Sequence, residues 1–181
     1  MAMKATIYKA SLQIADMDRH YYAQHNLTLA CHPSETEERL MLRLLAFALH
    51  ASDSLQFTRG LSSENEPDLW DKDSTGTITH WIEIGMPDES RIRKACGRAR
   101  RVSIYCYGAR TAQPWWEKNR QKLARFENLS VFFLSKEVTD AMALLATRNM
   151  DLHLFMQDGQ ATVSNNTSSI TVLPETWQSP S

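Results

Sequence analysis

Residues 67–85 read PDLWDKDSTGTITHWIEIG, and this stretch decides the predicted fold. Residues 68–73 and 77–84 have the character of strands, and they flank a turn-forming segment, Ser74-Thr75-Gly76. The pattern predicts two antiparallel strands joined by a tight turn. Asp68 opens the first strand and Glu83 lies near the end of the second, so the hairpin would bring two carboxylates together.

The length of the turn decides whether Asp68 and Glu83 share a face of the sheet. Residues that are directly opposed, or offset by two, lie on the same face. A four-residue loop (74–77) or a two-residue loop (74–75) gives them a shared face, with Cβ atoms about 5–8 Å apart. A three-residue loop would separate them, and Gly76 also suits a bulged turn. The sequence leaves the length of this loop open.

Two carboxylates on one face repel each other unless a cation neutralises them. Mg²⁺ binds oxygen ligands and commonly takes one or two protein carboxylates, with water completing its shell. Asp68 and Glu83 are therefore predicted metal ligands, with Mn²⁺ as a substitute for Mg²⁺. The alternative is that each acid faces solvent or pairs with an arginine. Arg91 lies near the end of the second strand and could pair with Glu83 in a structural role.

The N-terminal segment predicts a long hairpin. Residues 4–15 alternate between apolar and polar side chains, as a half-buried strand does. The apolar side chains of the predicted inner face are Tyr8, Ala10, Leu12 and Ile14. Residues 16–19 form the turn, and the second strand ends at Cys31.

A helix is expected to begin after this hairpin and to run to about residue 51. Ser34 is the predicted N-cap, and Glu37 at the third helical position completes a capping box. The predicted solvent-facing side of the helix is marked by Arg39, Arg43 and His50.

Helical and strand patterns alternate through the rest of the chain. Asp88 is the predicted cap of an arginine-rich helix. Further helices are expected at 112–125 and 136–147, and strands at 102–107, 131–134, 152–157, 160–164 and 169–173. Asp158-Gly159, between two alternating runs, is a strong hairpin signal. This order predicts an α/β (α+β) fold with additional β-hairpins from both terminal segments.

Composition excludes several classes of protein. Hydrophobic residues make up 43% of the 181 residues, enough for a packed core. No apolar run approaches the roughly 18 residues that span a membrane, and no signal-peptide pattern opens the chain, so we expect a cytoplasmic protein without membrane contact. The three cysteines and six histidines lack metal-ligand spacing, which argues against zinc.

A basic cluster follows the hairpin. Four of its residues are spaced by three, four and three along the chain, which on one helix would form a stripe able to follow a phosphate backbone: Arg91, Lys94, Arg98 and Arg101. The alternative is a solvated helix face balanced by nearby acids. Trp115 and Trp116 could likewise stack on bases, although core packing is the commoner role of such residues.

The chain resembles the YaeQ family of bacterial proteins over essentially its whole length. The strings that carry the resemblance are KATIYKA (4–10), HPSET (32–36), RLLA (43–46), LQFTRGL (55–61), EPD (66–68), WIEIG (81–85), PDE (87–89), RIRKACGR (91–98) and QDG (157–159). That family looks like a variant of the PD-(D/E)xK nuclease fold. The resemblance implies a single domain over 1–181, with a mixed central sheet flanked by helices at about 33–148. The segments 4–32 and 150–174 would be additions to this core.

The resemblance also assigns roles to residues. Asp68 takes the place of the motif's Asp, and Glu83 that of the acid in (D/E)xK. Gly85 stands where the motif has lysine, so the resemblance requires a replacement cation, for which we choose Lys94. An acid from the first helix often completes such a site; the resemblance implies Glu38, whereas helical phase favours Glu37.

Together these features predict a Mg²⁺-dependent phosphodiesterase or nuclease. Asp68 and Glu83 would hold the metal, Lys94 and Glu38 would assist, and the basic residues would contact nucleic acid. The alternative is a regulator that binds nucleic acid or protein on a nuclease fold that has lost its chemistry. The glycine at position 85 favours the alternative, and the two retained acids favour the enzyme.

Overall fold

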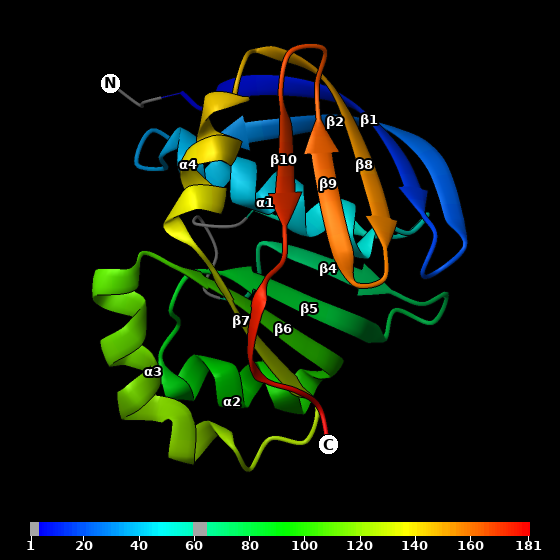
Figure 1. Ribbon diagram of the computed structural model, residues 1–181. Coiled ribbons are helices and arrows are strands. Elements are labelled where there is room, and N and C mark those ends of the chain that lie inside the picture. Colours follow the sequence, from blue (N-terminus) through cyan, green and yellow to red (C-terminus); the bar gives the residue numbers. More distant parts are fainter. Residues whose placement is uncertain (1–3, 60–64) are drawn as a thin grey trace. The chain divides into compact units, whose positions relative to one another are not determined.

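The computed structural model describes residues 4–59 and 65–181 (Figure 1). The sequence also predicts a polar loop at 61–66, and most of it lies outside these residues. The chain divides into two compact units: Met1–His50 with Glu137–Leu173, and Ala51–Lys136 with Pro174–Ser181. The chain is a mixed α+β protein with two mixed sheets and four helices in its described residues. The predicted single-domain organisation stays a prediction.

The first unit contains a five-stranded sheet in the order β10-β9-β8-β1-β2 (Figure 1). Its strands are β1 (Thr6–Asp16), β2 (Tyr21–Cys31), β8 (Asn149–Gln157), β9 (Gln160–Ser164) and β10 (Ser169–Val172). The predicted hairpins at both ends of the chain are confirmed, because β1 pairs antiparallel with β2 and β8 with β9. They are not separate additions, however: β1 and β8 pair in parallel and join both hairpins into one sheet.

The inner face of this sheet follows the alternation of the sequence. The side chains predicted to point inward on β1 are all buried: Tyr8, Ala10, Leu12 and Ile14. Their register continues onto β8, where Leu12 pairs with Leu152 and Ile14 with Leu154. Burial of these apolar rows stabilises the sheet by roughly 25 cal/mol per Å² removed from water.

The helix α1 (Glu37–His50) begins two residues later than a cap at Ser34 predicts. Thr36 is the cap, because its Oγ1 accepts a hydrogen bond from the backbone N–H of Arg39 at 3.1 Å. Ser34 bonds instead to the ring of His32 at 2.7 Å, so the Ser34 prediction is wrong. The predicted capping box between Ser34 and Glu37 is therefore wrong as well. The carboxylate of Glu37 accepts a hydrogen bond from the Tyr8 hydroxyl at 2.8 Å.

Burial also corrects the predicted solvent-facing side of α1. Every residue from Leu40 to Leu49 is buried, including Arg43. The Arg43 guanidinium is satisfied inside the unit, where it donates to the carboxylate of Glu35 and to the carbonyl of Ala30. The remaining helix, α4 (Lys136–Leu144), lies close to the prediction for residues 136–147.

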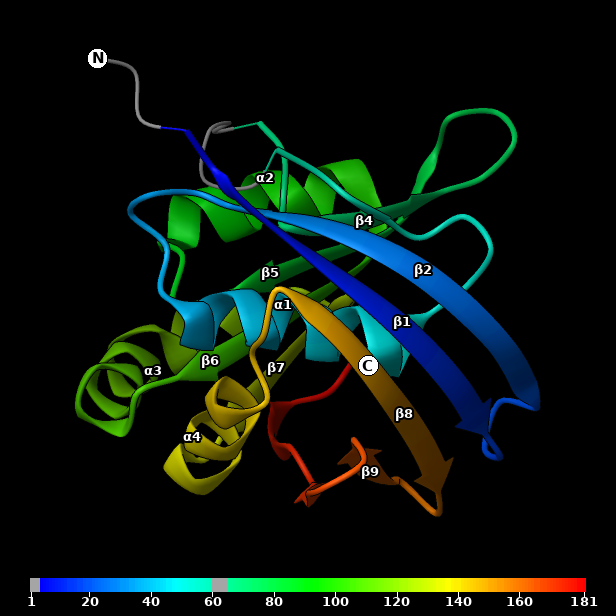
Figure 2. The same cartoon turned by 90° about the horizontal axis from the view of Figure 1, so that it is seen from above.

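The second unit contains a six-stranded sheet in the order β11-β7-β6-β5-β4-β3. Its strands are β3 (Gln56–Phe57), β4 (Leu69–Lys72), β5 (Ile78–Ile84), β6 (Ala99–Tyr107), β7 (Leu129–Leu134) and β11 (Glu175–Gln178). The helices α2 (Glu89–Arg98) and α3 (Ala109–Leu123) cover one face of it (Figures 1 and 2). The core beneath them includes Ile92 and Leu123 with Val102, Ile104 and Val131. The edge strand β11 was not predicted.

The end of α2 changes the predicted basic stripe. The helix ends at Arg98, and β6 begins at the next residue, Ala99. Arg101 therefore lies on a strand, so the helical spacing that linked it to Arg91 and Lys94 does not apply. In the described residues, no helix is both long and apolar enough to cross a membrane.

Candidate functional site

The hairpin β4–β5 has an odd loop and a bulge. Asp73 and Thr77 are bridged by a backbone hydrogen bond of 3.0 Å, which leaves residues 74–76 as a three-residue loop with Gly76 at φ 87°. Of the loop lengths that the sequence leaves open, the structure has the three-residue one. Lys72 pairs with Ile78, whereas Asp71 pairs with His80, so Thr79 is an extra residue in β5.

These two irregularities cancel. Beyond the bulge, Leu69 pairs with Ile82 in the register that an even loop would give. Asp68 directly precedes β4, and its backbone N–H donates to the carbonyl of Ile82 at 3.1 Å. The charge of Asp68 raises the pKa of the Glu83 carboxyl, so the two acids are neighbours.

Both acids of this pair are buried and hydrogen-bonded. Asp68 is 4% exposed and Glu83 6% exposed. The Oδ2 atom of Asp68 accepts a hydrogen bond from the backbone N–H of Ile84 at 2.8 Å. The Oε1 atom of Glu83 accepts one from the indole N–H of Trp81 at 2.9 Å. No role is predicted for Trp81 from the sequence, although its position two residues before Glu83 places both side chains on one face.

The cation Arg91 contacts Glu83, one of the two acids. The Nε atom of Arg91 donates to both carboxylate oxygens of Glu83, at 2.8 and 3.0 Å. An Nη2–H of Arg91 also donates to the carbonyl of Glu66 at 2.7 Å. Arg91 therefore pairs with Glu83, which is the structural role that the sequence leaves open as an alternative.

Electrostatics at Glu83 reflect competing influences. Burial raises the pKa of the Glu83 carboxyl most strongly, and the charge of nearby Asp68 raises it further. The hydrogen bond and charge of Arg91 oppose this rise, and so does the Trp81 hydrogen bond. Glu83 is thus a buried acid beside a second acid, with Arg91 as its cationic partner.

This arrangement does not fit a resident Mg²⁺ or Mn²⁺. Both oxygens of Glu83 are engaged by the Arg91 guanidinium, so a divalent ion would have to displace that cation. Within the described residues, no group of three or more histidine, cysteine, aspartate or glutamate side chains is placed to hold a metal. Asp68 and Glu83 are brought close together as the sequence predicts, and the carboxylate of Glu83 is occupied by an arginine.

Gly85, at the position of the motif's lysine, has a backbone that disfavours a side chain. Its φ is 125°, and its N–H donates to the carbonyl of Tyr105 at 2.8 Å. An L-residue rarely adopts this φ, so lysine at this position would be strained. The departure from the motif is therefore built into the main chain.

Lys94 is exposed on α2, beside a cavity of about 290 Å³. Within the described part of the chain it has no hydrogen bond or ion pair, so the structure does not link it to Asp68 or Glu83. The cavity is also lined by Trp81, Arg91, Arg93 and Arg98. The role of Lys94 as a replacement cation stays a prediction.

Neither Arg101 nor Glu38 is among the described residues that line this cavity. Arg101 donates from β6 to the ring Nδ1 of His80 at 3.0 Å, and the His80 Nε2 atom lies 2.7 Å from the hydroxyl of Ser103. Glu38 lies in the first turn of α1, in the first unit. Its contribution to the acid pair stays a prediction.

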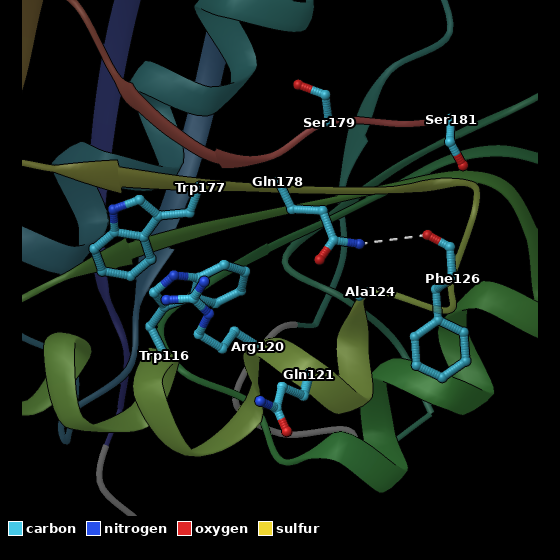
Figure 3. Close-up of a pocket in the computed structure, with 9 residues that line it drawn as sticks. All are labelled: Trp116, Arg120, Gln121, Ala124, Phe126, Trp177, Gln178, Ser179 and Ser181. Carbon is cyan, nitrogen blue, oxygen red and sulfur yellow. Dashed lines mark hydrogen bonds between the residues drawn. The ribbon is translucent and has the colours of Figure 1, made fainter.

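The two adjacent tryptophans pack within the second unit. Trp115 donates its indole N–H to the carbonyl of Pro87 at 2.9 Å. The Trp116 ring stacks on Trp177 at 5.5 Å, and Trp177 stacks on Phe133 at 4.9 Å. Beside them is a cavity of about 360 Å³, where Gln178 bonds to the carbonyl of Phe126 (Figure 3). These contacts favour packing over base stacking for both residues.

Comparison with known proteins identifies relatives along the entire chain. The family model described as YaeQ protein matches residues 1–174. The uncharacterised YaeQ proteins of Escherichia coli (strain K12) and Salmonella typhi are each 46% identical to this chain over 181 residues, with complete coverage of both sequences.

Solved structures agree with this assignment. The crystal structure of the YaeQ protein from Xanthomonas axonopodis pv. citri matches with a TM-score of 0.93 at 49% identity, covering 97% of this chain and 99% of that chain. The YaeQ protein from Pseudomonas syringae matches with a TM-score of 0.92 at 32% identity, covering 97% of each. The chain therefore belongs to the YaeQ family.

Proposed function

We propose that this protein binds nucleic acid through the cationic face of α2, on a scaffold that resembles a PD-(D/E)xK nuclease without its chemistry. One observation carries the proposal: among the residues that the structure describes, the cavity beside α2 is lined by four cationic side chains and by no acidic one. Those four residues are Arg91, Arg93, Lys94 and Arg98. Phosphate groups are the ligands that such a surface attracts.

The cations of this face are unequally available. Arg91 and Arg98 are partly engaged, because each donates to a backbone carbonyl in the segment Asn65–Glu66. Arg93 is 54% exposed, and its pair with Glu89 is long at 3.5 Å, so solvent weakens that pair. Lys94 and Arg93 would therefore supply most of the phosphate contacts. Contacts of this kind are independent of sequence and strongly dependent on salt.

Fluorescence anisotropy with labelled single- and double-stranded DNA and RNA tests the proposal. Lys94→Gln is expected to weaken binding about three- to tenfold at low salt, and to reduce the slope of log K against log[salt] by about 0.7–0.9. Lys118→Gln, on the exposed side of α3, is the matched control and should bind as the wild type does. Absence of binding at low salt, or an equal loss in both variants, would reject the proposal.

A second candidate is metal-dependent hydrolysis of phosphodiesters at the acid pair. It is favoured by the proximity of Asp68 and Glu83, both of which are buried. It requires Arg91 to leave Glu83. Cleavage of the same substrates with Mg²⁺ or Mn²⁺ decides between the two functions. Activity that Asp68→Ala abolishes would favour hydrolysis; inert wild-type protein that still binds would favour the regulator.

A further inference from the structure

The five-stranded sheet of the first unit has one long open edge. The strand β2 is outermost on its side of the sheet, and within the described residues β1 is the strand that it pairs with (Figure 2). It has eleven residues, whereas the other outer strands, β10, β3 and β11, have four, two and four. A long open edge is a ready template for a further strand.

The backbone of β1 shows which groups of β2 point outward. The N–H of Lys9 donates to the carbonyl of Arg148, just before β8, at 2.8 Å, so the backbone of Lys9 bonds toward β8. Its partner on β2 is Thr28, whose N–H and C=O therefore point away from β1. This orientation alternates along an antiparallel pair. The outward-pointing residues of β2 are thus Tyr22, Gln24, Asn26, Thr28 and Ala30.

One of these five residues is capped, and the other four are open. The carbonyl of Ala30 accepts a hydrogen bond from the Arg43 guanidinium at 2.9 Å. The side chains of the other four are exposed. Within the described part of the chain, their outward N–H and C=O groups have no hydrogen-bond partner. We call these four residues the open edge: Tyr22, Gln24, Asn26 and Thr28.

The strand also lacks the features that keep an edge from pairing. Its sequence, YYAQHNLTLAC, contains no lysine, arginine, aspartate, glutamate or proline. Its register with β1 runs from residue 21 to residue 31 without a bulge. Natural edge strands are commonly protected by charges, proline, bulges or short length. The open edge therefore suits the backbone of another strand.

The open edge is complementary to a second copy of itself. Its four residues are symmetric about His25, so a two-fold axis there would set two copies of β2 antiparallel. Gln24 would then lie opposite the partner subunit's Asn26, and Tyr22 opposite the partner subunit's Thr28. Amides would face amides and hydroxyls would face hydroxyls, with no lysine, arginine or acid on β2 to repel its copy. Two-fold pairing of identical chains is the commonest form of oligomer.

We propose that β2 is the interface of a homodimer, in which the β2 strands of two copies pair antiparallel and join their five-stranded sheets into one. The open backbone groups of each copy satisfy those of the other. This inference goes beyond nucleic-acid binding and does not depend on it, because it concerns the first unit and leaves α2 untouched.

Charge substitution across the two-fold axis tests the proposal. Analytical ultracentrifugation of the wild type should show a concentration-dependent dimer. Two double variants, Gln24→Lys/Asn26→Lys and Gln24→Glu/Asn26→Glu, should each raise the dimer Kd by at least about tenfold, because like charges then face each other at two places. An equimolar mixture of the two variants should form heterodimers, since every lysine then faces a glutamate.

A matched control places the same charges away from the edge. Gln13→Lys/Gln160→Lys puts two lysines at exposed positions on β1 and β9, and it should dimerise as the wild type does. An equal loss of dimer in the control and in the edge variants would show that net charge, and not β2 pairing, governs association. Charge variants that leave the dimer intact would likewise reject the proposal.

Amide hydrogen exchange of the wild type gives a readout that needs no substitution. At concentrations that form the dimer, the N–H groups of the open edge should exchange more slowly than at low concentration. Those of the intervening residues already bond to β1 and should not change. A dimer without this alternating protection would overturn the proposal. A wild type that stays monomeric at millimolar concentration would also overturn it and leave the edge to a different extended chain. Neither result changes the nucleic-acid measurement, so the two proposals fail separately.

Discussion

Two glutamates with buried side chains pair with arginine, and they differ in what lies beside them. Glu35, in the first unit, contacts Arg39 at 2.8 Å and Arg43 at 2.7 Å, so two cations contact one acid. Glu83, in the second unit, pairs with Arg91 and lies close enough to a second acid, Asp68, for that charge to raise its pKa. The first cluster gathers cations around an acid, and the second sets two acids side by side.

This difference separates a structural cluster from a candidate site. The side chains of Glu35 and Arg43 are only 2% and 6% exposed. At Glu83 the charge of Asp68 raises the pKa of the carboxyl, and Arg91 is 29% exposed. A buried ion pair is weak evidence for function by itself. The second acid beside Glu83 is what marks the second cluster.

Arg43→Met should produce the largest loss of stability. It leaves Glu35 buried with a single cationic partner and removes the donor to the Ala30 carbonyl. Breaking a buried pair typically costs about 3–5 kcal/mol of unfolding free energy. Urea unfolding measures the loss. Arg39→Met is the control and should lose less, because Arg39 is more exposed. Equal, small losses would show that Glu35 does not need the buried arginine.

Arg91→Gln should lose about 2–3 kcal/mol, less than Arg43→Met because Arg91 is partly exposed and solvent screens its charge. The physical cause is the same, since Glu83 is left buried beside Asp68 without its arginine partner. Arg98→Gln should lose less than about 1 kcal/mol, because Arg98 contacts a carbonyl and not an acid. Comparable losses in both variants would contradict the special position of Arg91.

Gly85→Ala should destabilise by about 1–2 kcal/mol, because alanine strains a backbone at φ 125°. Space is not the cause, since a Cβ at this position has no other atom within 4 Å. Gly97→Ala, inside α2 and equally open, is the control and should gain up to about 1 kcal/mol from helix propensity. A neutral Gly85→Ala would mean that a side chain, including lysine, is tolerated at the motif position.

The pH dependence of the Glu83 cluster should be the smallest effect. The pKa of Glu83 is raised above its ordinary value of 4.5, mainly by burial. The native state then holds this proton more tightly than the unfolded state, so stability rises as pH falls through the folded pKa towards 4.5. Glu83→Gln cannot titrate. The Tm difference between wild type and Glu83→Gln should therefore shift in favour of wild type between pH 7 and pH 5. An opposite shift would mean that Arg91 outweighs burial.

Local patterns predicted most elements of the fold. Alternation identified β1, and the Asp88 cap of α2 is confirmed because Asp88 accepts the N–H of Arg91. Pairing between distant segments could not be read from such patterns. The parallel pair β1–β8 joins segments separated by most of the chain, and β11 forms only because β7 offers it an edge. The cap of α1 was misplaced because Ser34 and Thr36 are equally good caps by type.

The candidate site was predictable in its members and not in its geometry. Asp68, Glu83 and an Arg91 pairing were all considered from the sequence. The extra residue Thr79 carries no sequence mark of a bulge, so the register that brings the two acids together could not be derived. Burial of Arg43 was missed for a similar reason, since charge alone suggests solvent, and the partner that satisfies it, Glu35, lies before the helix.

The bulge at Thr79 couples the length of this hairpin to its charge pattern. A single-residue deletion at Thr79, or a single insertion into the loop, would preserve two strands and a turn while shifting the register that brings Asp68 and Glu83 together. Two compensating changes, one in the loop and one in the strand, would leave the pair intact. A single change in the length of this hairpin should therefore disturb the acid pair, whereas two compensating changes should preserve it.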